Sequence, residues 1–362
     1  MVTGLDVTIA ALTNDKSAGR LCVAPAACGV NRRLINGGIT YRDWVSDPKL
    51  FAQSYIEGAK AFNCDMTTGL MDLSVMAGDL GAHVRMDEQN TPFVDKTIVN
   101  SVEDYEKFEV PDIKKGRSAV LLEGTKLFCD VLNASSATGG FIEGPLLALT
   151  QSAGAERVFM DMYTNPSAIH RALKVMTDYD IEMVKAFAKT GCSGLCWDYL
   201  WGNYSCLGDA EYEEFEGCKK YAIGLNELTI KEGMGLSIHN CADLPHLDTQ
   251  ITKFKPGLYS MAYYPLIPGS PSAAESIEKG YADNCLLGGQ IDPQLFVKAS
   301  VEKMTQVTKN LCQEVKTALC KRGLGPRYYI AGGCEVPPGL DTKLENVKAV
   351  VDAVHAYGKI DW

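Results

Sequence analysis

The sequence lacks several features that would place it in common functional classes. It has no block of basic residues, and its 35 Lys and Arg against 45 Asp and Glu give a net charge of −10. Binding to the phosphate backbone of nucleic acids is therefore not expected. There is no apolar run of the roughly 20 residues that a membrane-spanning helix needs, so we expect no membrane partner. No Gly-x-Gly-x-x-Gly turn follows a predicted strand, which argues against a dinucleotide site.

Signs of secretion and disorder are also missing. The first twenty residues carry Asp6 early and lack a basic segment with a clean cleavage site, unlike a secretory signal. The 13 cysteines are scattered rather than arranged in a disulfide framework, so we expect reduced thiols and a cytoplasmic protein. With 46% hydrophobic residues and no low-complexity segment, the chain is typical of globular proteins. We expect one domain over residues 1–362.

What the chain does contain is a regular alternation of short apolar runs and amphipathic helical patterns. The apolar runs occupy residues 137–143, 194–199, 235–241, 258–264, 284–291 and 327–334. Helical patterns occupy residues 168–190, 211–231, 273–281, 301–321 and 344–357. Earlier in the chain, residues 20–26 and 63–69 fit two more strands, with a helix over 47–62 between them. Residues 84–100 alternate and contain turn residues, which predicts a hairpin insertion.

This alternation predicts an α/β fold with a parallel sheet and crossover helices. About eight units over this length favour a (β/α)8 TIM barrel, whose usual size is roughly 250 residues plus insertions. The expected barrel carries an N-terminal extension and the hairpin insertion. A doubly wound open sheet is the alternative.

One histidine and two cysteines stand at predicted strand ends. His239 and Cys241 are two residues apart on one strand, so their side chains face the same side. Cys334 ends the last strand, and closure of the barrel would bring it close to them. One imidazole and two thiolates form a good zinc set that leaves a fourth position for water or substrate. A His-x-Cys pair alone is weak evidence, so buried structural cysteines remain the alternative.

Two carboxylates at strand ends are candidate catalytic groups. Asp198 would be buried and would need a partner; it anchors substrate or water in one interpretation and is structural in the other. Glu143 precedes Gly144 and Pro145. It contacts substrate or orients a metal ligand, or it caps the following helix.

Aromatic residues near other strand ends are candidates for the wall of a substrate pocket. They are Tyr199, Trp201, Tyr204, Tyr263 and Tyr264. Aromatic loops after barrel strands either line a pocket for a planar or apolar ligand or only close the top of the barrel. Gln290, at the end of another predicted strand, is also a candidate substrate-binding residue.

Four stretches together resemble the uroporphyrinogen decarboxylase superfamily, over roughly residues 20–360. They are GGFIEGPLLAL, SIHNCAD, GGQIDPQLF and AGGCEVPPGLDTKLENVKAVVDA. The His-x-Cys pair followed far downstream by Gly-Gly-Cys-Glu-x-Pro-Pro resembles its zinc methyltransferase branch. That branch includes methylcobamide:coenzyme M methyltransferases and corrinoid-dependent enzymes that demethylate methoxylated compounds. The resemblance implies a (β/α)8 barrel and a zinc ion held by His239, Cys241 and Cys334.

The chain departs from the decarboxylases themselves. They carry an Arg-Gln-Ala-Gly-Arg stretch that holds substrate carboxylates, whereas the corresponding region here reads APAACGVNRRLINGG. After Asp198, the branch commonly has small residues and Pro, but this chain has Tyr-Leu-Trp-Gly-Asn-Tyr. These differences argue against porphyrinogen decarboxylation and favour an aromatic substrate over a coenzyme M-like thiol.

The leading hypothesis is a zinc-dependent methyltransferase that moves a methyl group from a small methylated substrate, such as an aryl methyl ether, to the cobalt of a corrinoid (cobalamin). The sequence has no Asp-x-His-x-x-Gly stretch, so a separate corrinoid protein is the expected partner. The alternative is a methylcobamide:thiol methyltransferase, in which zinc activates the thiol. A second alternative is a non-catalytic barrel that binds a corrinoid or a tetrapyrrole.

Overall fold

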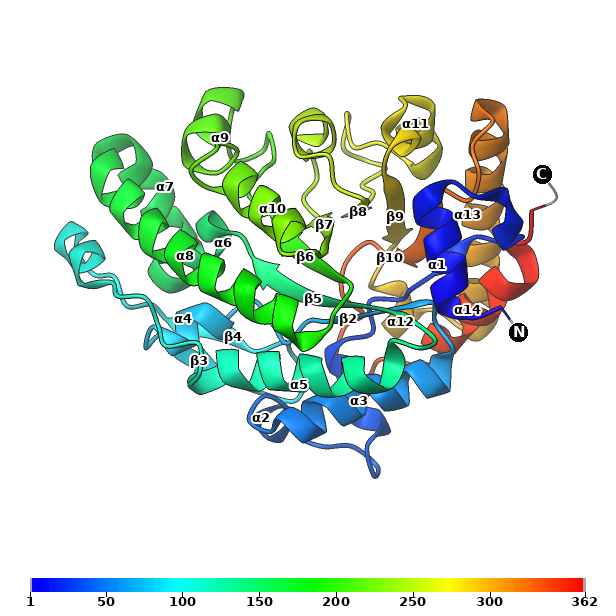
Figure 1. The fold of residues 1–362 in the computed structure, drawn as a ribbon, viewed down its shortest axis with the longest axis horizontal. Coiled ribbons are helices and arrows are strands. Elements are labelled where there is room, and N and C mark those ends of the chain that lie inside the picture. Colours follow the sequence, from blue (N-terminus) through cyan, green and yellow to red (C-terminus); the bar gives the residue numbers. More distant parts are fainter. Residues whose placement is uncertain (1, 361–362) are drawn as a thin grey trace.

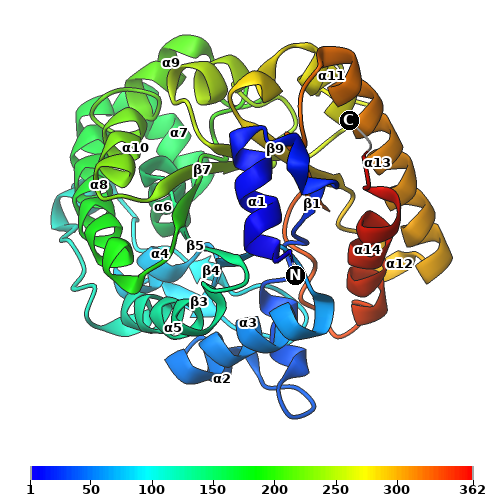
Figure 2. The same ribbon diagram turned by 45° about the vertical axis from the view of Figure 1, so that its right-hand side comes forward.

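The computed structural model describes residues 2–360, and its main feature is a sheet of eight parallel strands (Figures 1 and 2). The strands lie in the order β1-β10-β9-β8-β7-β6-β5-β2. They are β1 (Cys22–Val23), β2 (Met66–Gly69), β5 (Ala137–Glu143), β6 (Gly194–Asp198), β7 (Gly235–Asn240), β8 (Leu258–Met261), β9 (Leu286–Ile291) and β10 (Tyr328–Gly332). All eight predicted strands are present, and the predicted run 137–143 matches β5 at both ends.

The sheet closes between its two edge strands through Asp65, which precedes β2. The Asp65 N–H donates to the Val23 carbonyl (2.8 Å), and the Val23 N–H donates to the Asp65 carboxylate (2.8 Å). Arg20 donates two hydrogen bonds of 2.7 Å to the same carboxylate. The chain thus forms a nearly closed (β/α)8 barrel, as predicted, and not a doubly wound open sheet.

Helices form the outer ring of the barrel (Figure 2). The main ones are α3 (Pro48–Phe62), α5 (Gly116–Leu132), α8 (Pro166–Phe187), α10 (Ala222–Lys231), α11 (Ala273–Glu278), α13 (Val301–Arg322) and α14 (Leu344–Tyr357). Helix α3 shows how local sequence sets their ends. The Asp47 carboxylate caps the first N–H groups, Pro48 occupies the first turn, and Asn63 ends the helix in the left-handed conformation (φ 58°).

Several predicted boundaries differ from those in the structure. The pattern over 211–231 forms two helices, α9 (Asp209–Phe215) and α10, rather than one. The chain turns between them, and the Gly217 N–H bonds back to the Tyr212 carbonyl (2.7 Å). Strand β8 ends at Met261, three residues before the predicted end. The loop after it is held by Gln290, whose amide donates to the Ala262 carbonyl (3.3 Å).

The N-terminal extension and the hairpin insertion are both confirmed. Helix α1 (Gly4–Thr13) covers the N-terminal end of the barrel (Figure 2), where Val7 and Ala11 pack against a cluster that includes Leu286 and Tyr329. The hairpin comprises the antiparallel strands β3 (His83–Arg85) and β4 (Phe93–Lys96). Within residues 2–360, no helix has both the length and the apolar character needed to cross a bilayer.

Candidate metal centre and barrel cavity

The ends of β7 and β10 bring one histidine and two cysteines together. His239 lies near the end of β7, Cys241 directly follows that strand, and Cys334 follows β10. The ligand atoms of the three side chains all lie within 4.8 Å of one another. Strand alternation puts His239 and Cys241 on one side, and the curvature of the barrel brings Cys334 to the same place. The structure therefore brings together all three residues singled out as metal ligands.

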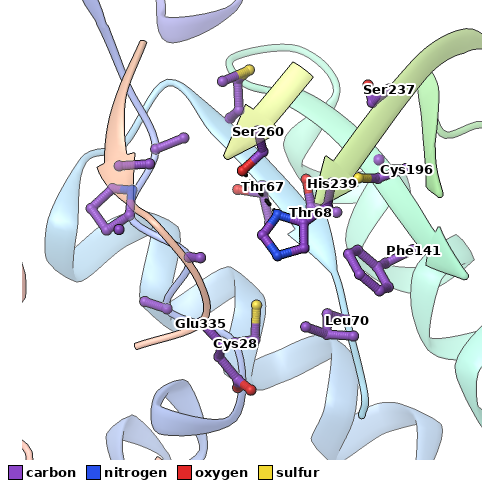
Figure 3. A pocket seen from close by; sticks show the side chains of 18 of the residues that line it. Cys28, Thr67, Thr68, Leu70, Phe141, Cys196, Ser237, His239, Ser260 and Glu335 are labelled. Carbon is purple, nitrogen blue, oxygen red and sulfur yellow. Dashed lines mark hydrogen bonds between the residues drawn. The ribbon is translucent and has the colours of Figure 1, made fainter. Parts of the chain in front are cut away.

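The orientation of the His239 ring is fixed by the neighbouring strand β8. Its Nδ1 lies 3.0 Å from the Ser260 hydroxyl (Figure 3), and the two residues are paired in the strand register. Because Nδ1 is engaged in this hydrogen bond, Nε2 remains available to a ligand. A hydrogen-bond partner on the second ring nitrogen is typical of metal-binding histidines.

The electrostatics of the cluster favour one thiolate. The hydrogen bond from Cys241 lowers the pKa of the Cys334 thiol to about 4, against the opposing effect of burial and with support from His239. The same hydrogen bond, together with burial, raises the pKa of Cys241. Burial lowers the pKa of His239, but Cys334 and Asp198 outweigh it and the net shift is upward. One imidazole and two sulfur atoms within reach of a single ion fit zinc.

Asp198 lies next to this cluster. It ends β6, is paired in register with His239, and is only 2% exposed. Burial raises its pKa to about 7, against the opposing charge of His239. Its Oδ1 has no hydrogen-bond partner among the described residues, and the residue lines the main cavity. This carboxyl is thus available to a bound molecule.

Glu143 lies apart from the main cavity. It ends β5 and borders a separate space of only about 10 Å3, which it shares with Asp180 and Tyr179. Burial raises its pKa well above the usual range, and the charges of Asp72 and Asp198 add to the shift. Contact of Glu143 with substrate therefore stays a prediction. The carboxyl is buried and does not line the main cavity.

The aromatic loop after β6 does not wall the cavity. Tyr199 is fully buried in the core, where its hydroxyl donates to Asn226 (2.8 Å) and its ring stacks on Trp197. The Trp201 indole donates to the Thr150 hydroxyl (2.7 Å). Tyr204 is 54% exposed at the surface. The expectation of a substrate wall is thus corrected, because packing against helices turns these rings away from the cavity.

Asn240 explains why this loop turns away. Strand alternation points it opposite to His239 and Cys241, and it is fully buried. Its amide donates to the carbonyls of Tyr199 (2.8 Å) and Gly202 (3.0 Å). The residue between two ligands therefore fixes the backbone of the neighbouring loop.

The remaining candidates support the loop after β8 rather than a ligand pocket. The Tyr264 hydroxyl donates to the Cys241 carbonyl (2.6 Å) and so holds the backbone of a ligand residue. Tyr263 is partly exposed. Gln290 adopts a left-handed conformation (φ 91°), and its amide donates to the Pro271 carbonyl (2.9 Å). None of the three lines the main cavity as the structure describes it.

The main cavity, of about 580 Å3, lies inside the barrel. His239, Cys241, Cys334 and Asp198 in its lining were predicted, but most of its walls were not. Figure 3 shows His239 among small and apolar side chains, including Ser237, Cys196 and Phe141. Glu335 also faces it; this carboxyl accepts from the Gly29 N–H (2.8 Å), and burial raises its pKa to about 8. The sequence feature that could have predicted this cavity is the run of small residues at alternate strand positions, such as 235 and 237 before His239.

Comparisons with known proteins agree with this architecture. The family model for uroporphyrinogen decarboxylase (URO-D) matches residues 8–357. A segment of the chain is 23% identical to the methylcobamide:CoM methyltransferase MtbA of Methanosarcina acetivorans, covering 50% of each protein. A uroporphyrinogen decarboxylase of Flavobacterium johnsoniae is 27% identical over 46% of this chain and 50% of that protein. The chain thus spans about half the length of these two relatives.

Longer matches cover nearly the whole chain. A uroporphyrinogen decarboxylase of Anaeromyxobacter dehalogenans is 23% identical over 90% of both proteins. The solved structure of a methyltransferase from Methanosarcina mazei superposes with a TM-score of 0.80 over 99% of both chains, at 18% identity. The family match spans both ends of the barrel, including all three clustered ligand residues. The chain therefore belongs to the uroporphyrinogen decarboxylase family.

Proposed function

We propose that this protein is a zinc-dependent methyltransferase that moves a methyl group from a small methylated substrate, with an aryl methyl ether as the leading case, to the cobalt of a separate corrinoid protein. The observation that carries the proposal is the cluster of His239, Cys241 and Cys334, whose ligand atoms lie within 4.8 Å of one another. The similarity to a methylcobamide:CoM methyltransferase supports both methyl transfer and a cobamide partner.

The three clustered residues would hold the zinc ion. Bound there, zinc would supply a Lewis acid that stabilises negative charge on the substrate heteroatom. Ser260 would keep the His239 ring in the orientation that ligation needs, since it engages Nδ1. The Tyr264 hydroxyl would hold the backbone at Cys241. Both contacts position ligand residues rather than touch the substrate.

In the leading reaction, the C–O bond of the ether breaks and the methyl group passes to Co(I) of the partner protein, while the oxygen takes up one proton. Asp198 is the carboxyl closest in register to His239, and its Oδ1 has no partner among the described residues. We therefore assign to Asp198 the role of holding a proton, or a water molecule, beside the leaving oxygen.

The contacts of two arginines near the N-terminus argue against porphyrinogen decarboxylation. Arg32 is fully buried and donates to the carbonyls of Pro338 (2.9 Å) and Glu88 (3.0 Å). Arg33 donates to the carbonyls of Gly339 (3.2 Å) and Thr342 (2.6 Å). Because these guanidinium groups bind the protein's own backbone, they are not presented to the carboxylates of a tetrapyrrole.

The sulfur-rich ligand set also supports a second candidate, methylation of a thiol by a methylated corrinoid. Two thiolates neutralise the charge of a zinc dication and so preserve the nucleophilicity of a bound sulfur. In this direction the Co–C bond breaks, an S–C bond forms, and the thiol loses its proton. The two candidates use the same cluster.

The test measures zinc content and then mixes the protein with a reduced corrinoid protein and a panel of methyl donors. Methylation of Co(I) by an aryl methyl ether, seen in the cobalt spectrum, is the expected result. No spectral change with ethers, but demethylation of the methylated corrinoid by an added thiol, would select the second candidate. Absence of both reactions in zinc-loaded protein would overturn the proposal.

A further inference from the structure

The interior of this barrel is hollow where TIM barrels are usually filled. The cavity meets His239 and Cys334 at one end and Thr8 and Leu12 of helix α1 at the other. Along β7 it is lined from Gly235 to His239, which corresponds to about 13 Å at 3.3 Å per residue. The cavity therefore runs from the ligand cluster toward the N-terminal end of the barrel.

Small side chains on successive strands leave this space open. Gly139 on β5, Cys196 on β6, Ser237 on β7 and Ser260 on β8 all line the cavity, whereas bulky branched residues fill these layers in ordinary TIM barrels. The Phe141 ring adds an apolar wall, with its centroid 6.2 Å from that of His239. The volume of about 580 Å3 lies in the range of pockets that enclose small organic molecules.

The ionisable side chains along the cavity offer no cationic partner to an anion outside the ligand cluster. Asp72, Asp198 and Glu335 line it, and none of the described lining residues is Lys or Arg. Asp72 is already paired with Arg117, which does not line the cavity. Among the described lining residues, His239 is the one titratable nitrogen base, and it belongs to the ligand cluster. A bound anion would lose its hydration without gaining a cationic partner, which is strongly unfavourable.

We infer that this cavity takes the body of an uncharged substrate, either a methyl ether or a thiol, with the reacting heteroatom at the ligand cluster and the remainder directed toward α1. The inference rests on the proposed function for the role of the cluster, and it narrows the substrate class. Neutral ethers or neutral thiols fit the cavity, and carboxylated or sulfonated ones do not. Because none of the described lining residues is Lys or Arg, this conclusion holds for both directions of methyl transfer.

Two matched pairs of ligands test the inference. Methoxybenzene is compared with 4-methoxybenzoate, and 2-mercaptoethanol with 2-mercaptoethanesulfonate, by calorimetry on zinc-loaded protein without corrinoid. The neutral member that binds is expected to bind at least about tenfold more tightly than its anionic partner. Equal or tighter binding of the anion, or binding by none of the four, would overturn the inference.

Variants locate the binding site. Ser237→Leu, or Cys196→Met if the first variant folds poorly, should fill the cavity and weaken binding of the neutral ligand at least about tenfold while zinc content stays at the wild-type level. Ser46→Leu adds the same side chain at an exposed position outside the cavity and should bind as wild type. Unchanged binding in a folded, zinc-loaded variant with a filled cavity would place the ligand elsewhere and overturn the inference.

The binding readout separates this inference from the proposed function. If neutral ligands bind selectively, Ser237→Leu abolishes this binding and no methyl transfer occurs, the proposed reaction is overturned but the inference about the cavity stands. Methyl transfer from a carboxylated ether, or to a sulfonated thiol, that binds more tightly than its neutral partner would support the proposed reaction and overturn the inference about the cavity.

Discussion

Strand β7 and the loop that follows β6 both carry candidate site residues, but the candidate side chain of β7 faces the cavity and those of the loop do not. His239 on β7 faces the cavity beside Cys241, as its position on a strand predicts. Tyr199, one residue beyond β6, is buried in the core, and Trp201 binds Thr150. Side-chain direction is fixed by alternation on a paired strand, whereas in a loop it depends on which neighbours pack against it. Three pairs of variants and one single variant test this contrast.

The largest effect is expected at the ligand cluster. Cys334→Ala should abolish zinc binding and reduce methyl transfer by at least about a thousandfold, or about 4 kcal/mol of transition-state stabilisation. Zinc analysis and the cobalt spectrum measure both quantities. Cys320→Ala removes an exposed thiol on α13 and should change neither. Full zinc content in Cys334→Ala would reject the metal assignment.

Truncation of Tyr199, in the loop after β6, should lower the stability of the fold and leave zinc binding unchanged. Tyr199→Ala leaves a cavity in the core and should lower the free energy of unfolding by about 3–5 kcal/mol, measured by denaturant titration. Zinc affinity of the folded variant should stay close to that of the wild type. If Tyr199→Ala weakened the binding of methoxybenzene with little change in stability, the ring would belong to the substrate site after all.

A smaller effect separates a residue that orients a ligand from a residue that packs. Ser260→Ala removes the partner of His239 Nδ1 and should weaken zinc affinity about 10- to 100-fold, as is typical for such partners. Trp201→Phe removes the hydrogen bond to Thr150 and should lower stability by about 1 kcal/mol. Competition with a chelator measures zinc affinity. Equal zinc affinity in Ser260→Ala and Trp201→Phe would contradict the assignment of Ser260 as the residue that orients His239.

The last predicted effect depends on pH and concerns a buried carboxyl in the region after β6. Glu216 lies between α9 and α10, is fully buried, and neither of its carboxyl oxygens has a partner among the described residues. Burial raises its pKa well above the usual value, and the charge of Asp198 adds to this. The folded state therefore holds this proton more tightly than the unfolded state does.

The sign of the pH dependence follows from that shift. The contribution of Glu216 is full below the unfolded pKa of about 4.3 and is lost as pH rises toward the folded value, at up to about 1.4 kcal/mol per pH unit. Glu216→Gln removes this loss, so unfolding curves at pH 5 and pH 8 should differ less in the variant than in the wild type. An equal or steeper decline in the variant would contradict the assignment, and Glu214→Gln, at a partly exposed position, serves as the control.

Much of the barrel could be predicted because strands leave a strong local signal. The run GGFIE ends β5 at Glu143, and the predicted helix 344–357 matches α14 at both ends. The helix predicted over 211–231 failed because the apolar period continues through Gly217, where the chain turns. The hollow interior was missed since each small residue, such as Ser237, is unremarkable until four strands place several of them around one axis.

The sequence by itself determined the alternation of strands and helices and the shared side of His239 and Cys241, because both follow from the two-residue period of a strand. Only the tertiary structure decided that Cys334 joins them, that Glu143 lies outside the main cavity, and that Tyr199 and Trp201 turn away from this cavity. These outcomes depend on contacts between segments far apart in the chain. Asn240 gives the physical reason in one residue: its direction is set by strand alternation, but its hydrogen bonds to Tyr199 and Gly202 exist only once β6 and β7 are paired.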